Sequence, residues 1–208
     1  MGLGKGVLIT FEGIEGCGKS TQINKLYKFL KKKKIKCIKT REPGGTKLSE
    51  KIRKLIISDL KNNEDNLTEL LLLFASRSNH FLKMSKYLKK DYIVICDRYI
   101  DSTYAYQHYE QGQSLQLINL LQKKIDNNLK PFITFFLDIP TSLSKKRLSN
   151  RTKLDRFDKY NVKKMNNIRK SFLKLNKKFK RIIKIDGVRS ENQVHNDIID
   201  LLLKKNVI

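Results

Sequence analysis

The sequence predicts an α/β fold in which helices flank a doubly wound, five-stranded parallel sheet. Two observations predict this class: five short runs of apolar or β-branched residues occur along the chain, and stretches of helical periodicity separate them. Alternating strands and helices are typical of parallel strands joined by crossover connections. The 208 residues show no internal repeat or linker, so we expect a single domain over 1–208.

The expected strands and helices alternate along the whole chain. Strand 7–11 (VLITF) is apolar and β-branched, and helix 19–33 carries Ile23, Leu26, Tyr27 and Leu30 on one face. The other expected strands cover 36–40, 92–96, 133–137 and 182–186, and the other helices cover about 47–58, 67–89, 115–127, 141–150, 160–179 and 192–204. Ligands bind beyond the carboxyl ends of the strands in such sheets, so the polar residues after each strand form the candidate site.

The first strand leads directly into a complete GxxxxGKS phosphate-binding loop (P-loop), which reads Gly13-Ile14-Glu15-Gly16-Cys17-Gly18-Lys19-Ser20. Glycines let backbone N–H groups curl around an anion, and the following helix adds the partial positive charge of its N-terminus. Lys19 can reach the outer phosphates of a nucleotide, and the Ser20 hydroxyl is placed to ligate Mg²⁺. This segment therefore predicts a nucleoside triphosphate site in a P-loop fold.

A shaped loop follows the second strand. Residues 40–46 (TREPGGT) combine a proline with two glycines, which indicates a defined backbone path, although an ordinary turn also fits the spacing. Thr46 or Ser49 can cap the helix that comes next.

The third strand ends in Asp97-Arg98-Tyr99. An Asp at a strand tip beside the P-loop can hold Mg²⁺ through water or accept a proton, and an adjacent Arg can clamp a phosphate with its bidentate fork. An ion pair on a surface turn explains the same spacing equally well.

A cationic stretch at about 145–158 lies between the fourth strand and a long helix, where a closing lid belongs. It contains Lys145, Lys146, Arg147, Arg151, Arg156 and Asp158. Positive groups placed on developing charge accelerate phosphoryl transfer, and a lid excludes water. A solvated basic face is a strong alternative in a chain of net charge +25.

Composition limits the classes of protein to consider. The 39% apolar and 31% charged residues are typical of a soluble enzyme, and no apolar run is long enough to span a membrane. Three scattered cysteines, Cys17, Cys37 and Cys96, argue against a disulfide framework or zinc site and indicate a reducing, cytoplasmic compartment. The excess of Lys and Arg is spread along the chain, which favours compositional drift over a dedicated nucleic-acid partner.

With its motifs in this order, the chain resembles thymidylate kinases of the bacterial type. The matching segments are Phe11 to Thr21, Arg41-Glu42-Pro43-Gly44-Gly45-Thr46, Phe74-Ala75-Ser76-Arg77, Asp97-Arg98-Tyr99, Ser102 to Gln107 and Leu154-Asp155-Arg156. The P-loop alone is generic, whereas the second loop combined with Asp-Arg-Tyr is far more specific. The resemblance implies transfer of the γ-phosphoryl group of ATP, with Mg²⁺, to dTMP, which gives dTDP.

The resemblance also implies where ATP and the metal bind. The ATP phosphates would lie in the loop from Gly13 to Thr21, with Lys19 and Ser20 on the phosphates and the metal. Asp97 would organise Mg²⁺ and the acceptor phosphate. Because Gly16 supplies no cation from the loop, Arg151 in the lid would be the transition-state arginine, with Arg147 and Arg156 as further lid cations.

The residues that the resemblance assigns to dTMP come from several segments. Arg98 would clamp the acceptor phosphate, Glu15 would approach the 3′-hydroxyl, and Tyr106 would crowd the 2′ position and so select deoxyribose. Phe74 would stack on thymine and Arg77 would hydrogen-bond its edge. The other expected substrate contacts are Glu42, Pro43, Thr103 and Gln107.

Partners and rival functions complete the predictions. The resemblance implies a homodimer, and helix 67–81 with its run of leucines is a candidate contributor, although core packing explains those leucines as well. One rival is a kinase for another nucleoside or nucleotide. The other is a P-loop ATPase that binds nucleic acid, which would usually end its strand in Asp-Glu or Asp-x-x-Gly rather than in Asp97-Arg98-Tyr99.

Overall fold

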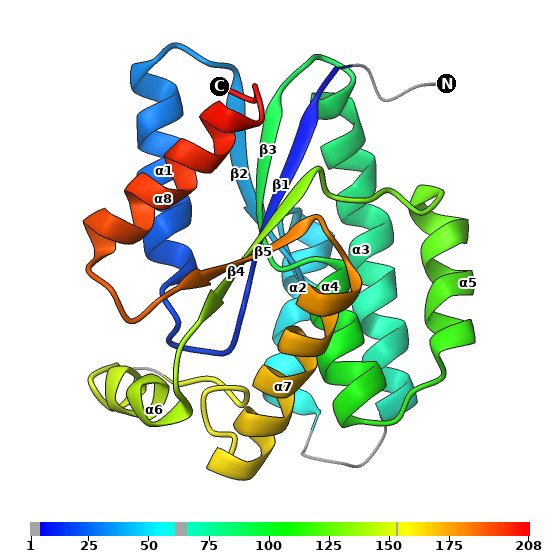
Figure 1. The fold of residues 1–208 in the computed structure, drawn as a ribbon. Helices are drawn as coiled ribbons and strands as arrows, with labels where there is room; N and C mark the ends of the chain where they lie inside the picture. Colours follow the sequence, from blue (N-terminus) through cyan, green and yellow to red (C-terminus); the bar gives the residue numbers. More distant parts are fainter. Residues whose placement is uncertain (1–4, 61–65, 153) are drawn as a thin grey trace.

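The computed structural model describes residues 5–60, 66–152 and 154–208. Residue 153, within the expected lid, lies outside the described residues. The strands are β1 (Val7–Glu12), β2 (Cys37–Arg41), β3 (Ile93–Asp97), β4 (Ile133–Asp138) and β5 (Ile182–Asp186). They form one all-parallel sheet in the order β2-β3-β1-β4-β5, which confirms the predicted fold class (Figure 1).

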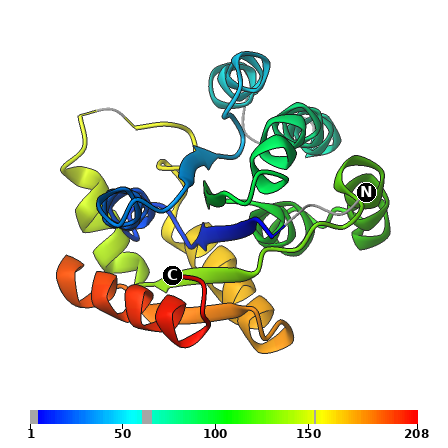
Figure 2. The ribbon, with the colours of Figure 1, turned by 90° about the horizontal axis from the view of Figure 1, so that it is seen from above.

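The helices cover both faces of the sheet (Figure 2). The helices α1 (Lys19–Lys32) and α8 (Glu191–Lys204) lie on one face. The other face carries α3 (Asn66–Leu88), α5 (Leu115–Asp126) and α7 (Val162–Lys178). The short helices α2 (Lys47–Lys54) and α6 (Thr141–Ser149) follow the carboxyl ends of β2 and β4.

Alternating side chains of the central strands explain the two layers. Ile9 and Ile95 pack with Ile23 and Leu26 of α1 in one buried cluster. Leu8 and Val94, on the opposite side of the pleat, pack with α3 in a second buried cluster. Because Glu12 is four residues after Leu8, its side chain points to the same face as α3.

The register of the sheet brings the strand ends to one level. Asp97 pairs with Phe11 on β1 and with Arg41 on β2, so the loops that follow β1, β2 and β3 begin side by side. This edge is the one from which the P-loop, the Arg41–Thr46 loop and the Asp97-Arg98-Tyr99 turn emerge (Figure 1). The expected grouping of polar residues beyond the carboxyl ends is therefore present.

The structure differs from the sequence-based expectation mainly after β3. No helix was expected between the third strand and residue 115, but α4 (Ile100–Thr103) continues into a π-helical segment, η2 (Tyr104–Glu110). This segment contains three tyrosines together with a Ser, a Thr, an Asp and a His, all of weak helix propensity, so its periodicity is not visible in the sequence. Packing against α7 and buried hydrogen bonds to β1 stabilise it instead.

Smaller corrections concern helix ends. The helix expected at 160–179 begins at Val162, because the Asn161 side chain accepts a hydrogen bond from the Lys164 N–H and caps it. The helix expected at 47–58 leaves the α-helical path after Lys54 and continues as a π-helical turn, η1 (Leu55–Asp59). Of the two residues expected to cap this helix, Thr46 is the N-cap of α2, and its side chain accepts a hydrogen bond from the Ser49 N–H. No helix within the described ranges is long and apolar enough to cross a membrane.

Candidate active site

Two cavities meet at the P-loop. The first, of about 210 Å³, opens beyond β1, β2 and β3, and the second, of about 260 Å³, lies between the P-loop and the start of α8. Gly16, Lys19, Ser20 and Arg151 line both. The predicted residues that line only the first are Glu15, Glu42, Pro43, Arg77, Asp97, Arg98, Thr103, Tyr106 and Gln107. Those that line only the second are Cys17, Gly18, Thr21 and Arg147.

The P-loop has the backbone that its glycines allow. Gly13 has φ +137, and a Cβ there would lie 2.6 Å from the Leu137 carbonyl oxygen, so only glycine fits. The Lys19 ammonium donates to the carbonyl oxygens of Gly13 (2.9 Å) and Ile14 (3.1 Å). Gly13 and Ile14 line neither cavity. Their carbonyl oxygens instead hold the Lys19 side chain at the junction of the two cavities.

A Mg²⁺ site is supported by an unpartnered oxygen. The Ser20 hydroxyl donates to Asp97 Oδ2 at 3.3 Å. Asp97 Oδ1 is buried, and it has no hydrogen-bond partner among the described residues. Mg²⁺ prefers oxygen ligands and is usually held by one or two protein groups together with substrate phosphates and water. The pair Ser20 and Asp97 fits that requirement, and the described part of the chain contains no cluster of three or more His, Cys, Asp or Glu side chains that could hold a metal by itself.

Arg98 is held in an unusual position at the start of the loop after β3. Its φ is +66, in the left-handed region that costs a non-glycine residue energy. Its guanidinium donates to Glu15 Oε1 (2.7 Å) and to Ser102 Oγ (3.0 Å), and it lies over the Tyr106 ring. Burial opposes the charge, but Tyr106 and the carboxylates of Glu15, Glu12 and Asp97 raise the pKa of Arg98 above its ordinary value. This arginine stays a cation and faces the first cavity.

Glu15 and Tyr106 form the wall beside Arg98. The Tyr106 hydroxyl donates to the Glu15 carboxylate, 2.8 Å from Oε1 and 3.0 Å from Oε2. Burial, together with the neighbouring Glu15 charge, raises the pKa of Tyr106 well above its ordinary value. The phenol therefore stays protonated as a donor, and its ring is fixed at the cavity.

Arg77 lines the first cavity, and three side chains of the protein hold its guanidinium there. Its guanidinium donates to Glu42 (2.7 Å), Thr103 (2.9 Å) and Gln122 (3.3 Å). Burial disfavours the Glu42 charge, but Arg77 and His80 outweigh it and lower the pKa of Glu42. Since a guanidinium has five N–H donors, two remain for a ligand.

Phe74 does not line the first cavity. Its ring is 2% exposed and lies under the Arg77 guanidinium, 4.9 Å from the ring centroid, while the neighbouring Leu73 lines the cavity. Stacking of Phe74 on a base therefore stays a prediction. Gln107 lines the cavity and donates to Glu69 at 2.8 Å.

The cationic residues of the expected lid take three different positions. Arg151 is half-exposed at the junction of the cavities and donates to Asp158 at 3.2 Å. Arg147 donates to the carbonyl oxygens of Gly16 (3.4 Å) and Gly187 (3.1 Å), beside the second cavity. Arg156 pairs with Glu69 on α3 and lines neither cavity.

Sequence reasoning assigned no role to Arg41 or to Arg53 on α2, although both line the first cavity, and Arg53 is the more informative case. It lines that cavity and donates to the Pro43 carbonyl oxygen at 3.2 Å. Burial and the nearby Arg41 and Arg98 lower its pKa, partly offset by Asp155. A signal was present, because Ser49, Ile52, Arg53 and Ile56 have the i, i+3, i+4, i+7 spacing of an inward helical stripe. An arginine in such a stripe, directly after a strand-end loop, points to a site.

Comparisons with known proteins agree with this arrangement. The family model described as "Thymidylate kinase" matches residues 11–198. A thymidylate kinase of Sulfurihydrogenibium sp. (strain YO3AOP1) is 42% identical over 205 residues, covering 98% of this chain and all of that protein. Thymidylate kinases of Vesicomyosocius okutanii and Thermosipho africanus are 41% and 38% identical over 87% and 95% of this chain, and over 89% and 98% of their own lengths.

Proposed function

Because the chain belongs to the thymidylate kinase family and is a phosphotransferase acting on dTMP, we propose that ATP is its phosphoryl donor, with Mg²⁺, and that the two cavities hold the two nucleotides end to end. The observation that carries this proposal is the junction at Lys19, Ser20 and Arg151, which line both cavities. The second cavity, lined by the P-loop, would take ATP, and the first would take dTMP.

The acceptor phosphate would be bound by two arginines. Arg98 and Arg53 both line the first cavity, and each can offer a planar pair of N–H donors to phosphate oxygens. Asp97 stands beside them, where the acceptor oxygen would approach the donor. These contacts would hold the attacking oxygen in line, which is most of what a phosphoryl-transfer enzyme must do.

Selection of thymine and deoxyribose would fall to Arg77 and Tyr106, which both line the first cavity. Arg77, held by Glu42, Thr103 and Gln122, would donate its remaining N–H groups to the base edge. The Tyr106 ring, fixed by its bond to Glu15, would leave no room for a 2′-hydroxyl.

Charge that develops during transfer would be stabilised by Lys19 and Arg151. Both lie at the junction of the cavities, and their positive charges act with little competition from water once the lid is closed. Mg²⁺, when held by Ser20 and Asp97, would supply further neutralisation of the phosphate oxygens. Arg147 would support the ATP side, whereas Arg156 would tie the lid to α3 through Glu69.

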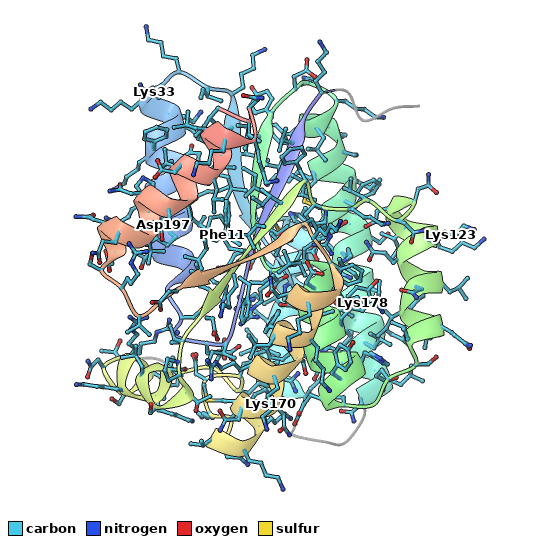
Figure 3. The ribbon with its side chains drawn as sticks, in the orientation of Figure 1. Phe11, Lys33, Lys123, Lys170, Lys178 and Asp197 are labelled. Atoms are coloured by element: carbon cyan, nitrogen blue, oxygen red, sulfur yellow. The ribbon has the colours of Figure 1, made fainter. Side chains whose placement is uncertain are left out.

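The excess positive charge would reflect composition rather than a binding face for nucleic acid. Lys33 in the turn after α1, Lys123 on α5, and Lys170 and Lys178 on α7 are exposed and lie in different parts of the molecule (Figure 3). The relatives named above are thymidylate kinases, so they give no support to a nucleic-acid ATPase. We propose a cytoplasmic enzyme, in line with its three buried, unpaired cysteines.

A homodimer is also part of the proposal. Leu48 on α2, Leu55 on η1, and Leu71 and Leu82 on α3 are exposed, and α2 packs on α3. Such apolar side chains on adjoining helices favour a contact with a second copy. Sedimentation equilibrium of the parent and of a Leu71→Glu variant tests this, because the charged variant should be monomeric.

The decisive experiment is ATP-dependent phosphorylation of dTMP, dUMP, UMP, dGMP and thymidine with Mg²⁺, with a control lacking any acceptor and another with DNA added. We expect turnover of dTMP in preference to UMP and thymidine. Arg98→Ala should raise the KM for dTMP and lower kcat, whereas Lys123→Ala, an equal loss of charge on the outer face of α5, should change neither. ATP hydrolysis that ignores every acceptor and rises with DNA would overturn the proposal.

A further inference from the structure

Glu12, the last residue of β1, is a fully buried acid that the proposed reaction does not use. It lines neither cavity at the P-loop. Its Oε1 accepts from the N–H groups of Tyr99 (2.8 Å) and Ser102 (3.2 Å), and its Oε2 accepts from the Ser102 hydroxyl (2.6 Å). All three donors belong to the segment that directly follows Arg98.

The hydrogen-bond donors to Glu12 are uncharged groups. Among the described residues, none forms an ion pair with it, although a second buried carboxylate nearby, Asp101, is held by both terminal nitrogens of Arg181 (2.6 and 2.7 Å). Burial, with the Asp101 charge, raises the pKa of Glu12 to about 7. A buried carboxylate that forms no ion pair costs free energy unless hydrogen bonds compensate it, so the donors on the segment after Arg98 are what stabilise Glu12 in place.

The contacts of Glu12 lead to Arg98 by two routes. Through the side chain, the Ser102 hydroxyl donates to Glu12 and accepts from the Arg98 guanidinium at 3.0 Å. Through the backbone, the bond to the Tyr99 N–H fixes the peptide that follows Arg98. The Arg98 N–H is bonded to the Phe11 carbonyl oxygen at 3.0 Å, so β1 holds the left-handed residue from both sides.

We propose that Glu12 is the positioning residue for Arg98: its carboxylate holds the strained backbone and, through Ser102, aims the guanidinium at the acceptor phosphate. The inference rests on the proposed function, in which Arg98 binds that phosphate. Glu12 itself touches no substrate. Loss of its carboxylate should therefore weaken the contact with the phosphate and leave binding of the nucleoside portion unchanged.

The test compares two ligands that differ only by the phosphate. Calorimetric titration of dTMP and of thymidine gives the ratio of their dissociation constants for the parent and for Glu12→Gln, which keeps the size but places an N–H donor against Ser102. A hydrogen bond to a charged group is worth roughly tenfold or more in affinity. We therefore expect the dissociation constant of dTMP to rise about tenfold in Glu12→Gln and that of thymidine to change less than twofold.

A matched control separates positioning from general damage to the buried cluster. Asp101→Asn removes the neighbouring buried carboxylate, which pairs with Arg181, and should lower the thermal midpoint without changing the ligand ratio. Ser102→Ala removes the hydroxyl that links Glu12 to Arg98, and it should reproduce the selective loss of dTMP affinity. In the double variant Glu12→Gln with Ser102→Ala, the losses should not multiply, because both act on one chain of contacts.

Two outcomes would overturn the inference. One is an unchanged ratio of dTMP to thymidine affinity in Glu12→Gln. The other is a selective loss of dTMP affinity in Asp101→Asn as large as the loss in Glu12→Gln. If Glu12→Gln cannot be purified folded, an unchanged ratio in Ser102→Ala overturns it. Arg98→Ala separates an error in the proposed function from an error in this inference. If Arg98→Ala keeps the parent's preference for dTMP over thymidine, the proposed phosphate contact is wrong. If only Glu12→Gln keeps that preference, the phosphate contact stands and the positioning role of Glu12 is wrong.

Discussion

The burial of Glu12 makes a quantitative prediction about stability and pH. The pKa of this carboxyl is raised from about 4.5 to about 7 in the folded protein, mainly by loss of solvent. At about 1.4 kcal/mol per pH unit, the difference corresponds to about 3 kcal/mol. The folded state binds the proton of Glu12 more tightly than the unfolded chain does. The resulting stabilisation of the fold is therefore complete below about pH 4.5 and is lost as the pH rises through 7.

Glu12→Gln cannot titrate, so it should escape that loss. The assay is urea unfolding of the parent and the variant at constant ionic strength between pH 4.5 and 8. The difference in unfolding free energy should move in favour of Glu12→Gln by about 3 kcal/mol with rising pH. A difference that stays flat from pH 4.5 to 8 would refute the reasoning, since it would mean that the folded and unfolded chains bind this proton equally.

The remaining predictions concern other parts of the candidate site. Arg151→Ala should lower kcat by about 10²-fold with little change in the KM for dTMP, because its charge acts on the transferring group, and steady-state kinetics with both substrates measure this. Tyr106→Phe should lower the free energy of unfolding by about 1–2 kcal/mol, because Glu15 loses a buried donor, yet keep the preference for dUMP over UMP, because the ring remains. Gly45→Ala should cost at least about 2 kcal/mol in thermal or urea unfolding, because φ is +86 and the added Cβ would lie 2.6 Å from the His80 ring.

Each of these has an outcome that contradicts it. A parent-like kcat in Arg151→Ala would leave the lid without a catalytic cation at the junction. Loss of the dUMP preference in Tyr106→Phe would assign selectivity to the hydroxyl rather than to the ring. Full stability of Gly45→Ala would show that the loop after β2 can move, and Gly112→Ala is the control, because its φ is +74 but nothing lies within 4 Å of the added Cβ.

Much of the site could be predicted because its pieces are local. The P-loop needs glycines at fixed spacing, and each strand end is marked by a polar turn after an apolar run, so the sequence could single out Lys19, Asp97 and Arg98, which line the first cavity. Arg53 and Gln122 were not, since each is a single polar residue inside a helix. Their importance comes only from the helix face they share with buried neighbours and from the partners that this face meets.

The sequence by itself determined the alternation of strands and helices, the phosphate-binding loop and the family resemblance, because each depends on residues close together in the chain. The tertiary structure decided which distant groups meet. Glu12 contacts Ser102 across 90 positions, and Arg98 contacts Glu15 across 83, because parallel pairing of β1 and β3 sets their ends at one level. The helix after β3 forms for the same reason. Its residues favour helix only weakly, and buried bonds to the neighbouring strand supply the stability that local propensity lacks.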